Sequence, residues 1–333
     1  MKLVTFVGER GDARLGALFA NDQRIADLAG ARALGGSPPA PAFASMLDLI
    51  EAGPEGLALA AETLAWAERR GPDGACLDRA STTLLAPLPR PTQIRDFLCF
   101  ELHLKQAIQN LYDTQASRTP DPEATKKKLR EEGRYALPDV WYEHPVYYKA
   151  NRMSVIGTDH DVRWPRYSRL IDYELEFATV IGRAGRDILR ENALDHVFGY
   201  TIFNDFSARD AQGREMPGQL GPAKGKDFDT GNAMGPCIVT ADEVDPARLT
   251  MVARVNGEEW SRGSSETMYH RVEDCIVHAS RSETLYPGEV FGSGTVGNGC
   301  GLELGRFLKP GDVVELEISG IGVLRNRITT EDA

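Results

Sequence analysis

Three acidic residues alternate along an otherwise apolar segment, LIDYELEFATVIG (170–182). Asp172, Glu174 and Glu176 occupy every second position, so in a β-strand their side chains would point to the same face. The Cα atoms of neighbouring acidic residues of this kind lie roughly 6.6 Å apart, and two unit charges at that distance repel each other by roughly 2.5 kcal/mol at an effective dielectric constant of about 20. The pattern therefore predicts either a solvated face or a positive charge that offsets the repulsion.

Two other segments place acidic groups in apolar surroundings. Asp96 lies within the strand-like IRDFLCF, and His103 follows seven residues later on an expected helix. Asp205 ends the apolar GYTIFND, shortly before Arg209 and Gln212. The carboxylates that could form an all-oxygen metal site are Asp96, Glu174, Glu176 and Asp205. Such sites suit Mg²⁺, Ca²⁺ or Mn²⁺, whereas zinc and copper prefer nitrogen and sulfur ligands.

Each of these residues also has an ordinary structural explanation. An aspartate at a strand end is more often a turn or cap residue, and alternating glutamates more often form the wet face of an antiparallel sheet. A single histidine at the margin of a helical stripe is more often a plain surface or core residue. Against the wet-face alternative, Ala178 and Val180 continue the face of the glutamates, so we expect that face to be at least partly buried.

Two glycine-rich segments do not carry the features of nucleotide-binding loops. KGKDFDTGNAMGP (224–236) lacks the G-K-[ST] ending of a phosphate-binding loop. GSGTVG (292–297) matches G-x-G-x-x-G, but only about ten residues separate it from Lys309-Pro310-Gly311, too few for the helix of a dinucleotide-binding unit. The sequence also contains no G-x-S-x-G nucleophile motif. We therefore expect 224–236 to be a loop between strands, and we exclude a dinucleotide site at 292–297.

The composition is that of a globular protein without a nucleic-acid or membrane surface. The 333 residues include 38 Lys and Arg against 49 Asp and Glu, and the net charge of −11 argues against binding to nucleic acids or anionic membranes. Five scattered cysteines without a C-x-x-C pair fit a reducing compartment and exclude the usual thiolate zinc patterns. No secretory or membrane-spanning segment is recognisable, so we expect a soluble, cytoplasmic protein.

Residues 1–86 are predicted to form a small α+β domain. Three short strand-like runs precede two helical segments at about 43–52 and 55–70, which Gly53-Pro54 separates. Residues 87–92, with Pro87, Pro89 and Pro91, are predicted to form a stiff linker.

Residues 93–333 are predicted to form a strand-rich catalytic domain, so the fold class is α+β and dominated by β-strands. The expected strands are 93–99, 145–149, 172–182, 199–205, 235–240, 250–256 and 312–318. Helices are expected at 101–112 and in the charged run 123–134, and loops at 113–145 and 258–270 are expected to shape a substrate pocket. The apolar stripe of the first helix consists of Leu104, Ile108, Leu111 and Tyr112, with His103 at its margin.

Taken together, five motifs in residues 90–325 resemble the fumarylacetoacetate hydrolase family. In order they are DFLCFELH, DYELEFATVIG, NDFSARDAQ, GKDFDT and GSGTVGNGCGLELGRFLKPGDVVELEI. The resemblance implies a mixed β-sandwich or roll as the catalytic domain, preceded by a small N-terminal domain. It also implies a homodimer and a small keto-acid substrate.

The resemblance implies a role for individual residues. The implied metal ligands are Asp96, Glu174, Glu176 and Asp205, with Thr230 beside the metal. His103 matches the general base, and Glu303 matches the acidic partner that orients it. The residues that match the stabilisers of the oxyanion and substrate are Arg209, Gln212 and Lys226. Tyr148 and Thr295 match substrate contacts, whereas Asp172 matches no ligand and is expected to be a strand-entry or supporting residue.

The implied activity is hydrolysis of a carbon–carbon bond in a β-diketone-type acid, resembling fumarylacetoacetate or an acylpyruvate. A divalent cation, Mg²⁺ or alternatively Ca²⁺ or Mn²⁺, would polarise the carbonyl while His103 activates water. Smaller family members often pair a histidine with a glutamate three residues later, but here that position is Gln106. This favours hydrolysis over the alternatives on the same scaffold, which are a dehydratase, an isomerase or a decarboxylase of a 2-keto acid. A non-catalytic metal- or ligand-binding module is a further alternative.

Overall fold

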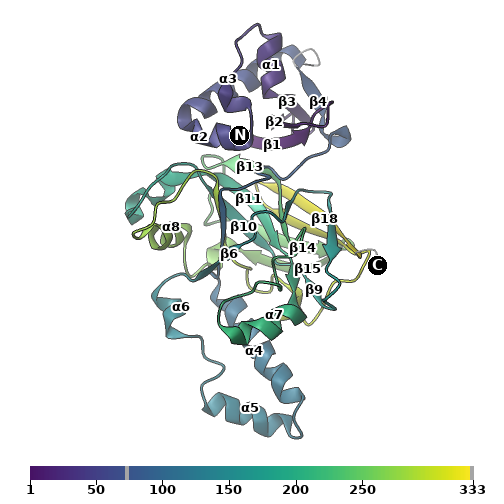
Figure 1. Ribbon diagram of the computed structural model, residues 1–333, viewed down its shortest axis with the longest axis vertical. Coiled ribbons are helices and arrows are strands. Elements are labelled where there is room, and N and C mark those ends of the chain that lie inside the picture. The colour runs from purple at the N-terminus through teal and green to yellow at the C-terminus, as the bar shows by residue number, and fades with distance from the viewer. Residues whose placement is uncertain (72–74, 331–333) are drawn as a thin grey trace.

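The computed structural model describes residues 1–71 and 75–330 and has a strand-dominated α+β architecture, which confirms the predicted fold class. An N-terminal unit lies at one end, two packed sheets form the middle, and a group of helices extends from the other end (Figure 1). Across the described residues, no helix is both long and apolar enough to cross a membrane.

The N-terminal unit is an antiparallel meander with helices packed against it. Its strands are β1 (Lys2–Val7), β2 (Ala13–Phe19), β3 (Arg24–Asp27) and β4 (Cys76–Asp78). Its helices are α1 (Leu28–Leu34), α2 (Met46–Glu51) and α3 (Gly53–Arg70), with a short 3₁₀ turn at Pro41–Phe43. Asp27 and Ser45 cap α1 and α2 by accepting hydrogen bonds from backbone N–H groups, and the predicted break at Gly53-Pro54 is the start of α3.

One long sheet runs through the N-terminal unit and the strand-rich region. In the described residues its strand order is β4-β3-β2-β1-β13-β11-β10-β16-β5-β6, and β7 pairs with β13. The added strands are β5 (Gln93–Phe97), β6 (Tyr147–Ala150), β7 (Val155–Ile156), β10 (Glu176–Ile181), β11 (Val197–Asp205), β13 (Asn232–Thr240) and β16 (Glu289–Gly292). Because β1 pairs with β13, hydrogen bonds cross the division at 87–92, and the domain boundary stays a prediction.

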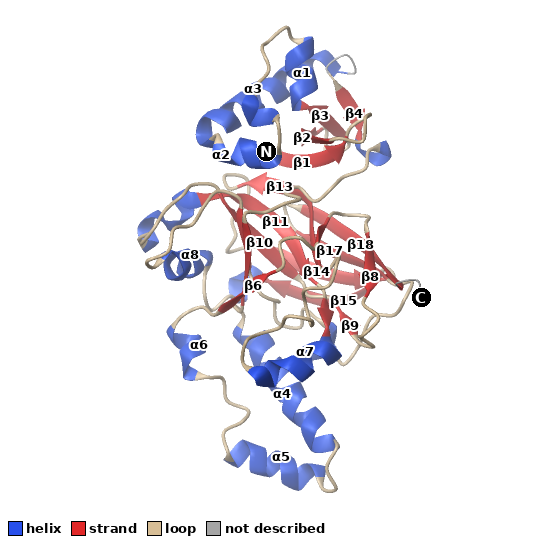
Figure 2. Ribbon diagram, viewed as in Figure 1, coloured by secondary structure: helices blue, strands red, loops and turns tan. Residues whose placement is uncertain are grey.

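A second sheet packs against the long one (Figure 2). Its order is β15-β14-β17-β18-β8, made of β8 (Asp161–Trp164), β14 (Thr250–Val255), β15 (Glu258–Ser264), β17 (Val313–Ile318) and β18 (Gly322–Thr330). Phe177 and Tyr200 of the long sheet share one buried cluster with Leu316 and Leu324 of the second. Full burial of each such side chain contributes about 1.5–3 kcal/mol, so this interface is the main core of the molecule.

The predicted strand 172–182 is divided in the structure. A two-stranded ribbon pairs β9 (Ile171–Asp172) with β12 (Ser207–Ala208), Glu174 makes a single bridge to Cys300, and β10 begins only at Glu176. The chain changes partners within these residues, which local alternation cannot reveal. Strands β8, β15, β16 and β18 were also missed, and the expected loop 258–270 contains β15.

Helices α4 (Glu101–Ser117), α5 (Pro122–Glu131) and α6 (Asp139–Glu143) follow β5 and extend away from the sheets (Figure 1). Helix α5 confirms the helix expected at 123–134, whereas α6 and the end of α4 replace further parts of the loop expected at 113–145. On α4 the predicted apolar stripe is wrong in part, because Leu111 is 58% exposed whereas His103 is only 6% exposed. The helix buries the histidine side of its first turn, since that side faces the carboxylates described below. The other α-helices of the described residues are α7 (Arg209–Glu215), α8 (Val272–Ser280) and α9 (Gly301–Leu304).

Candidate active site and metal centre

Neighbouring strands of the long sheet bring the predicted carboxylates together. Asp96 lies on β5, Glu176 starts β10, Asp205 ends β11, and Glu174 precedes β10. The exposed fractions of the four residues are between 0% and 6%, and Asp172 is fully buried. The wet-face alternative is therefore wrong, and the repulsion between these groups is not relieved by bulk water.

Three of these carboxylates have an oxygen that is buried without a hydrogen bond. Among the described residues, Oδ1 of Asp96, Oε1 of Glu176 and Oδ1 of Asp205 have no partner. Oxygen atoms of Asp96, Glu174 and Glu176 lie within 4.8 Å of one another. An unpaired buried acceptor is unfavourable by about 1–3 kcal/mol, more when it is charged. An all-oxygen donor set with unpaired atoms fits a hard divalent cation, with Asp205 adjoining the other three residues.

A glycine on the strand between β5 and β10 makes room for this group. Gly292 of β16 lies opposite Asp96 in the parallel ladder. A Cβ atom at Gly292 would lie 2.3 Å from Oδ1 of Asp96, so any larger residue would displace the carboxylate. Two residues later, the backbone N–H of Gly294 donates a hydrogen bond to Oε2 of Glu176 at 3.0 Å. The G-x-G-x-x-G segment, excluded above as a dinucleotide site, thus shapes and orients the acidic cluster.

Burial and mutual repulsion give the carboxylates different pKa values and therefore different charge states. Burial raises the pKa of Asp96 well above its ordinary value, and Asp205 adds to the effect. Burial and the neighbouring Asp96 likewise raise the pKa of Glu176. Burial acts in the same direction on Glu174, but Lys226 and Arg209 oppose it, and the pKa of Glu174 falls to about 2. Without a cation, Asp96 and Glu176 therefore favour the protonated form while Glu174 stays ionised.

Lys226 provides the positive charge nearest to the cluster. Its Nζ atom lies 2.7 Å from Oε2 of Glu174 and 2.6 Å from Oδ2 of Asp205. Tyr148, which lies opposite Asp96 in the β5–β6 ladder, donates its hydroxyl to the same Oδ2 of Asp205 at 2.6 Å. Lys226 is only 3% exposed, so it is a fixed part of the site.

Arg209 connects the acidic cluster to the helix that carries Glu303. Its guanidinium lies 2.8 Å from both Oδ2 of Asp172 and Oε1 of Glu174. Asp172 also accepts hydrogen bonds from the backbone N–H groups of Gly301 and Leu302, at 2.6 and 2.9 Å. Asp172 is therefore a supporting residue that positions Arg209 and the start of α9. Gln212 accepts a hydrogen bond from Arg209 at 3.1 Å.

Replacement of Asp172 with asparagine should lower kcat/KM by about 10–100-fold for any substrate that the site turns over, the usual effect of removing a partner that orients a site group. The substitution removes the negative charge that holds Arg209, while the hydrogen bonds to α9 can partly persist. Mg²⁺ affinity should change little, because Asp172 offers no atom to the cluster of Asp96, Glu174 and Glu176. Asp245→Asn, at a side chain that is 57% exposed, is the control. Loss of Mg²⁺ binding in parallel with activity would contradict this role.

His103 and Glu303 meet beside the acidic cluster. Nδ1 of His103 lies 3.3 Å from Oε1 of Glu303, and their side chains are 8% and 0% exposed. The contact does not have hydrogen-bond geometry, so Nδ1 has no hydrogen-bond partner within the described part of the chain. Donor atoms of this pair and of Cys300 lie within 4.8 Å of one another, and Cys300 bridges Glu174, so the pair adjoins the acidic cluster.

The backbone around α9 and contacts from α4 hold this pair in place. Glu303 accepts hydrogen bonds from the N–H groups of Asn298 and Cys300, both at 3.0 Å. Gln106 of α4 donates to Oδ1 of Asn298 at 2.7 Å, and Asn110 donates to the carbonyl oxygen of Leu302 at 2.8 Å. In the sequence, Gln106 indicated only that the glutamate of the smaller family members is absent here, and no pattern pointed to Asn298. Of the residues that support the site, Asp172 is the one that the sequence itself marked, because it is the third acidic side chain on an apolar strand.

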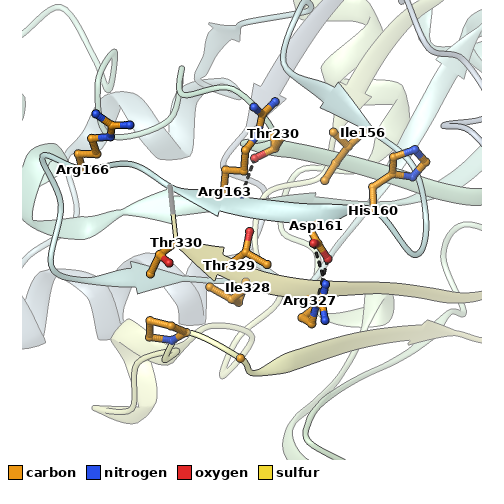
Figure 3. A pocket seen from close by; sticks show the side chains of 12 residues that line it. Ile156, His160, Asp161, Arg163, Arg166, Thr230, Arg327, Ile328, Thr329 and Thr330 are labelled. Carbon is orange, nitrogen blue, oxygen red and sulfur yellow. Dashed lines mark hydrogen bonds and ion pairs between the residues drawn. The ribbon is translucent and has the colours of Figure 1, made fainter. Parts of the chain in front are cut away.

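The two predicted threonines lie in different surroundings. Thr295 is 2% exposed and its Oγ1 atom has no hydrogen-bond partner in the described residues, so it remains available to a ligand. Oγ1 of Thr230 accepts a hydrogen bond from the N–H of Arg163 at 2.8 Å. Thr230 lines an open groove of about 960 Å³ beside β8 and the end of β18, where Asp161 pairs with Arg327 (Figure 3). Its position beside a metal stays a prediction.

Comparison with known proteins identifies relatives of this chain. Residues 122–329 match the family model for the C-terminal domain of fumarylacetoacetate (FAA) hydrolase. The chain is 39% identical over 188 residues to the mitochondrial oxaloacetate tautomerase fahd2 of Xenopus laevis. That match covers 56% of this chain and 58% of the relative, so it spans little more than half of the curated protein. Asp96 and His103 precede the residues matched by the family model, and their assignment depends on the geometry above.

Two solved structures have the same fold over nearly the whole chain. The fumarylacetoacetate hydrolase of Exiguobacterium antarcticum superposes with a TM-score of 0.72 at 28% identity, covering 99% of this chain and 100% of the other. The maleylpyruvate hydrolase of Sphingobium sp. SYK-6, solved in complex with manganese(II) and pyruvate, superposes with a TM-score of 0.70 at 25% identity and covers 100% of both chains. The family match over most of the strand-rich region and the shared fold lead to one conclusion: this chain belongs to the fumarylacetoacetate hydrolase family.

Proposed function

We propose that this protein is a divalent-cation-dependent hydrolase that cleaves a carbon–carbon bond in a 1,3-diketone acid resembling fumarylacetoacetate or an acylpyruvate. The observation that carries the proposal is the buried pair of His103 and Glu303 beside four buried carboxylates. Hydrolysis needs a base for water in addition to groups that stabilise negative charge, and this pair supplies the base.

The proposed metal ligands are Asp96, Glu174, Glu176 and Asp205. A bound divalent cation would supply a Lewis acid that polarises the substrate carbonyl and stabilises negative charge on its oxygen. We propose Mg²⁺, while Ca²⁺ and Mn²⁺ suit the same all-oxygen donors. The manganese in the Sphingobium hydrolase supports a divalent cation in this fold.

The side chains of the protein itself divide the remaining tasks. Glu303 faces Nδ1 of His103, so Nε2 is the nitrogen that accepts a proton from the attacking water. The negative charge of Glu303 favours the imidazolium that forms, as the third member of a catalytic triad does. Arg209 and Lys226 place positive charge where the oxyanion develops, and Gln212 adds a hydrogen-bond donor. Tyr148 and Thr295 are proposed to contact the substrate.

An oxaloacetate tautomerase is the second candidate. The name of the Xenopus relative supports it. The same histidine could move a proton between carbon and oxygen of a 2-oxo acid without activating water, and the same cationic groups would stabilise the enolate. The two reactions differ in whether a carbon–carbon bond is broken.

A substrate panel distinguishes these candidates. Chelator-treated protein with added Mg²⁺ or Mn²⁺ is incubated with acylpyruvates, fumarylacetoacetate, oxaloacetate and a 2-oxo-3-deoxy sugar acid, and the products are identified. Cleavage of a 1,3-diketone acid into two carboxylic-acid products, abolished by chelator, is expected. Accelerated keto–enol exchange of oxaloacetate without cleavage would replace the hydrolase with the tautomerase. Release of pyruvate from oxaloacetate alone would indicate a decarboxylase, and no turnover with either metal would contradict both candidates.

A further inference from the structure

A second group of possible metal donors lies beside the acidic cluster and has a different chemistry. His103 of α4 offers a nitrogen, Cys300 a sulfur and Glu303 of α9 an oxygen, and these donor atoms lie within 4.8 Å of one another. His103 and Cys300 are 6% and 0% exposed, and the Glu303 side chain is fully buried. The usual thiolate zinc patterns were excluded by the cysteine spacing, but a site with a single thiolate needs no such spacing.

The geometry of the group suits a tetrahedral ion. Zinc–nitrogen bonds of about 2.0–2.1 Å and zinc–oxygen bonds of about 2.0–2.2 Å at a tetrahedral angle place the two donor atoms roughly 3.3–3.5 Å apart. Nδ1 of His103 and Oε1 of Glu303 are separated by 3.3 Å. Nδ1 has no hydrogen-bond partner in the described residues, so its lone pair becomes available to a metal in the tautomer that carries the ring proton on Nε2.

The surrounding backbone holds the other two donors. Cys300 is the residue before α9, and its backbone bridges Glu174. The two oxygens of Glu303 each accept one N–H bond, from Asn298 and Cys300, and a carboxylate oxygen has a second lone pair for a metal. Metal binding would draw the three donor atoms, which lie within 4.8 Å of one another, closer together.

We propose that His103, Cys300 and Glu303 form a binding site for Zn²⁺ that is separate from the carboxylate site and inhibits the enzyme. Imidazole and thiolate favour zinc, whereas the carboxylate cluster favours harder cations, so the two sites select different metals. Binding replaces the proton on the Cys300 sulfur with the metal, and that proton passes to the solvent. The metal also takes the lone pair of Nδ1, so the ring proton of His103 moves from Nδ1 to Nε2, where it blocks the nitrogen that serves as the base. The inhibitory effect rests on the proposed function, because Zn²⁺ would hold the histidine that serves as the base.

The binding site is tested by ultraviolet spectroscopy, without reference to activity. Wild-type protein saturated with Mg²⁺ is titrated with Cd²⁺, which forms thiolate bonds with a characteristic charge-transfer absorbance. We expect this band to saturate at one equivalent and to be lost in Cys300→Ser. The control is Cys275→Ser, whose sulfur lies 3.5 Å from that of Cys99 in a different buried pair, and this variant should keep the band. A band that persists in Cys300→Ser, or the absence of a band in the wild type, would overturn the site.

Inhibition is tested separately, with a substrate that the protein has been found to convert and with saturating Mg²⁺. Each variant is compared with its own rate without zinc. The Zn²⁺ concentration for half-inhibition should rise by at least about ten-fold in Cys300→Ser, since even outer partners of a metal site change affinity by 10–100-fold. Equal inhibition of both proteins would show that Zn²⁺ acts at the carboxylates and would overturn the inhibitory role. If no substrate is turned over, the proposed function fails while the spectroscopic result stands.

Discussion

Replacement of His103 with alanine is expected to lower kcat by about 10²–10⁴-fold, the usual contribution of a positioned general base. His103 lies beside both an acidic partner and the carboxylate cluster, and it is 6% exposed. Water could not replace it efficiently, because a solvent molecule in that position would lack the orientation that Glu303 provides. The measurement is the rate of product formation with saturating Mg²⁺.

Metal binding separates this catalytic effect from general damage to the site. The His103→Ala protein should bind Mg²⁺ with nearly unchanged affinity in calorimetry, since the proposed ligands are the four carboxylates. His160→Ala, in the groove beside β8, is the matched control and should retain activity. Retention of most activity by His103→Ala would exclude its role as the base. Loss of both activity and Mg²⁺ binding would instead place the histidine in the metal site.

Addition of Mg²⁺ should increase the free energy of unfolding by about 2.7 kcal/mol when its concentration is 100 times the dissociation constant. The structural reason is that Asp96, Glu176 and Asp205 each bury an oxygen without a hydrogen-bond partner among the described residues. Chelator-treated protein is melted with and without Mg²⁺, and the wild type should show a clear rise in melting temperature. A melting temperature that does not change when Mg²⁺ is added would contradict the metal assignment.

Replacement of one proposed metal ligand by a neutral side chain tests the metal assignment more specifically. Glu176→Gln should abolish the rise caused by Mg²⁺ without lowering the stability of the metal-free protein, because Glu176 already favours its neutral form there. Glu131→Gln, on a side chain that is 68% exposed, should behave as the wild type. The Mg²⁺-dependent rise should also shrink as the pH falls. The raised pKa values of Asp96 and Glu176 mean that the cation must displace protons, and this becomes harder in acid.

The types of side chain in the site could be predicted from the sequence, because they follow from local patterns of residues. Alternation in DYELE indicated that Glu174 and Glu176 share surroundings, and the apolar residues after them indicated burial, which the structure confirms. The oxygen-only donor set pointed to a hard cation before any geometry was known. The strand-rich α+β class followed from short β-prone runs separated by turns. The homodimer, the cytoplasmic location and the roles of individual site residues stay predictions.

The tertiary structure decided which distant residues meet. Asp96 joins Glu176 because β16 pairs with both β5 and β10, a neighbour relation that no local pattern encodes. His103 is buried against Glu303 because α4 packs on α9, whereas its helical stripe predicted a marginal position. Asp172 proved to hold Arg209 since the chain changes sheets after β9. The period of a sequence pattern determines the face of a strand to which a side chain points. Strand order and register determine which other side chains it contacts, and these depend on the packing of the whole core.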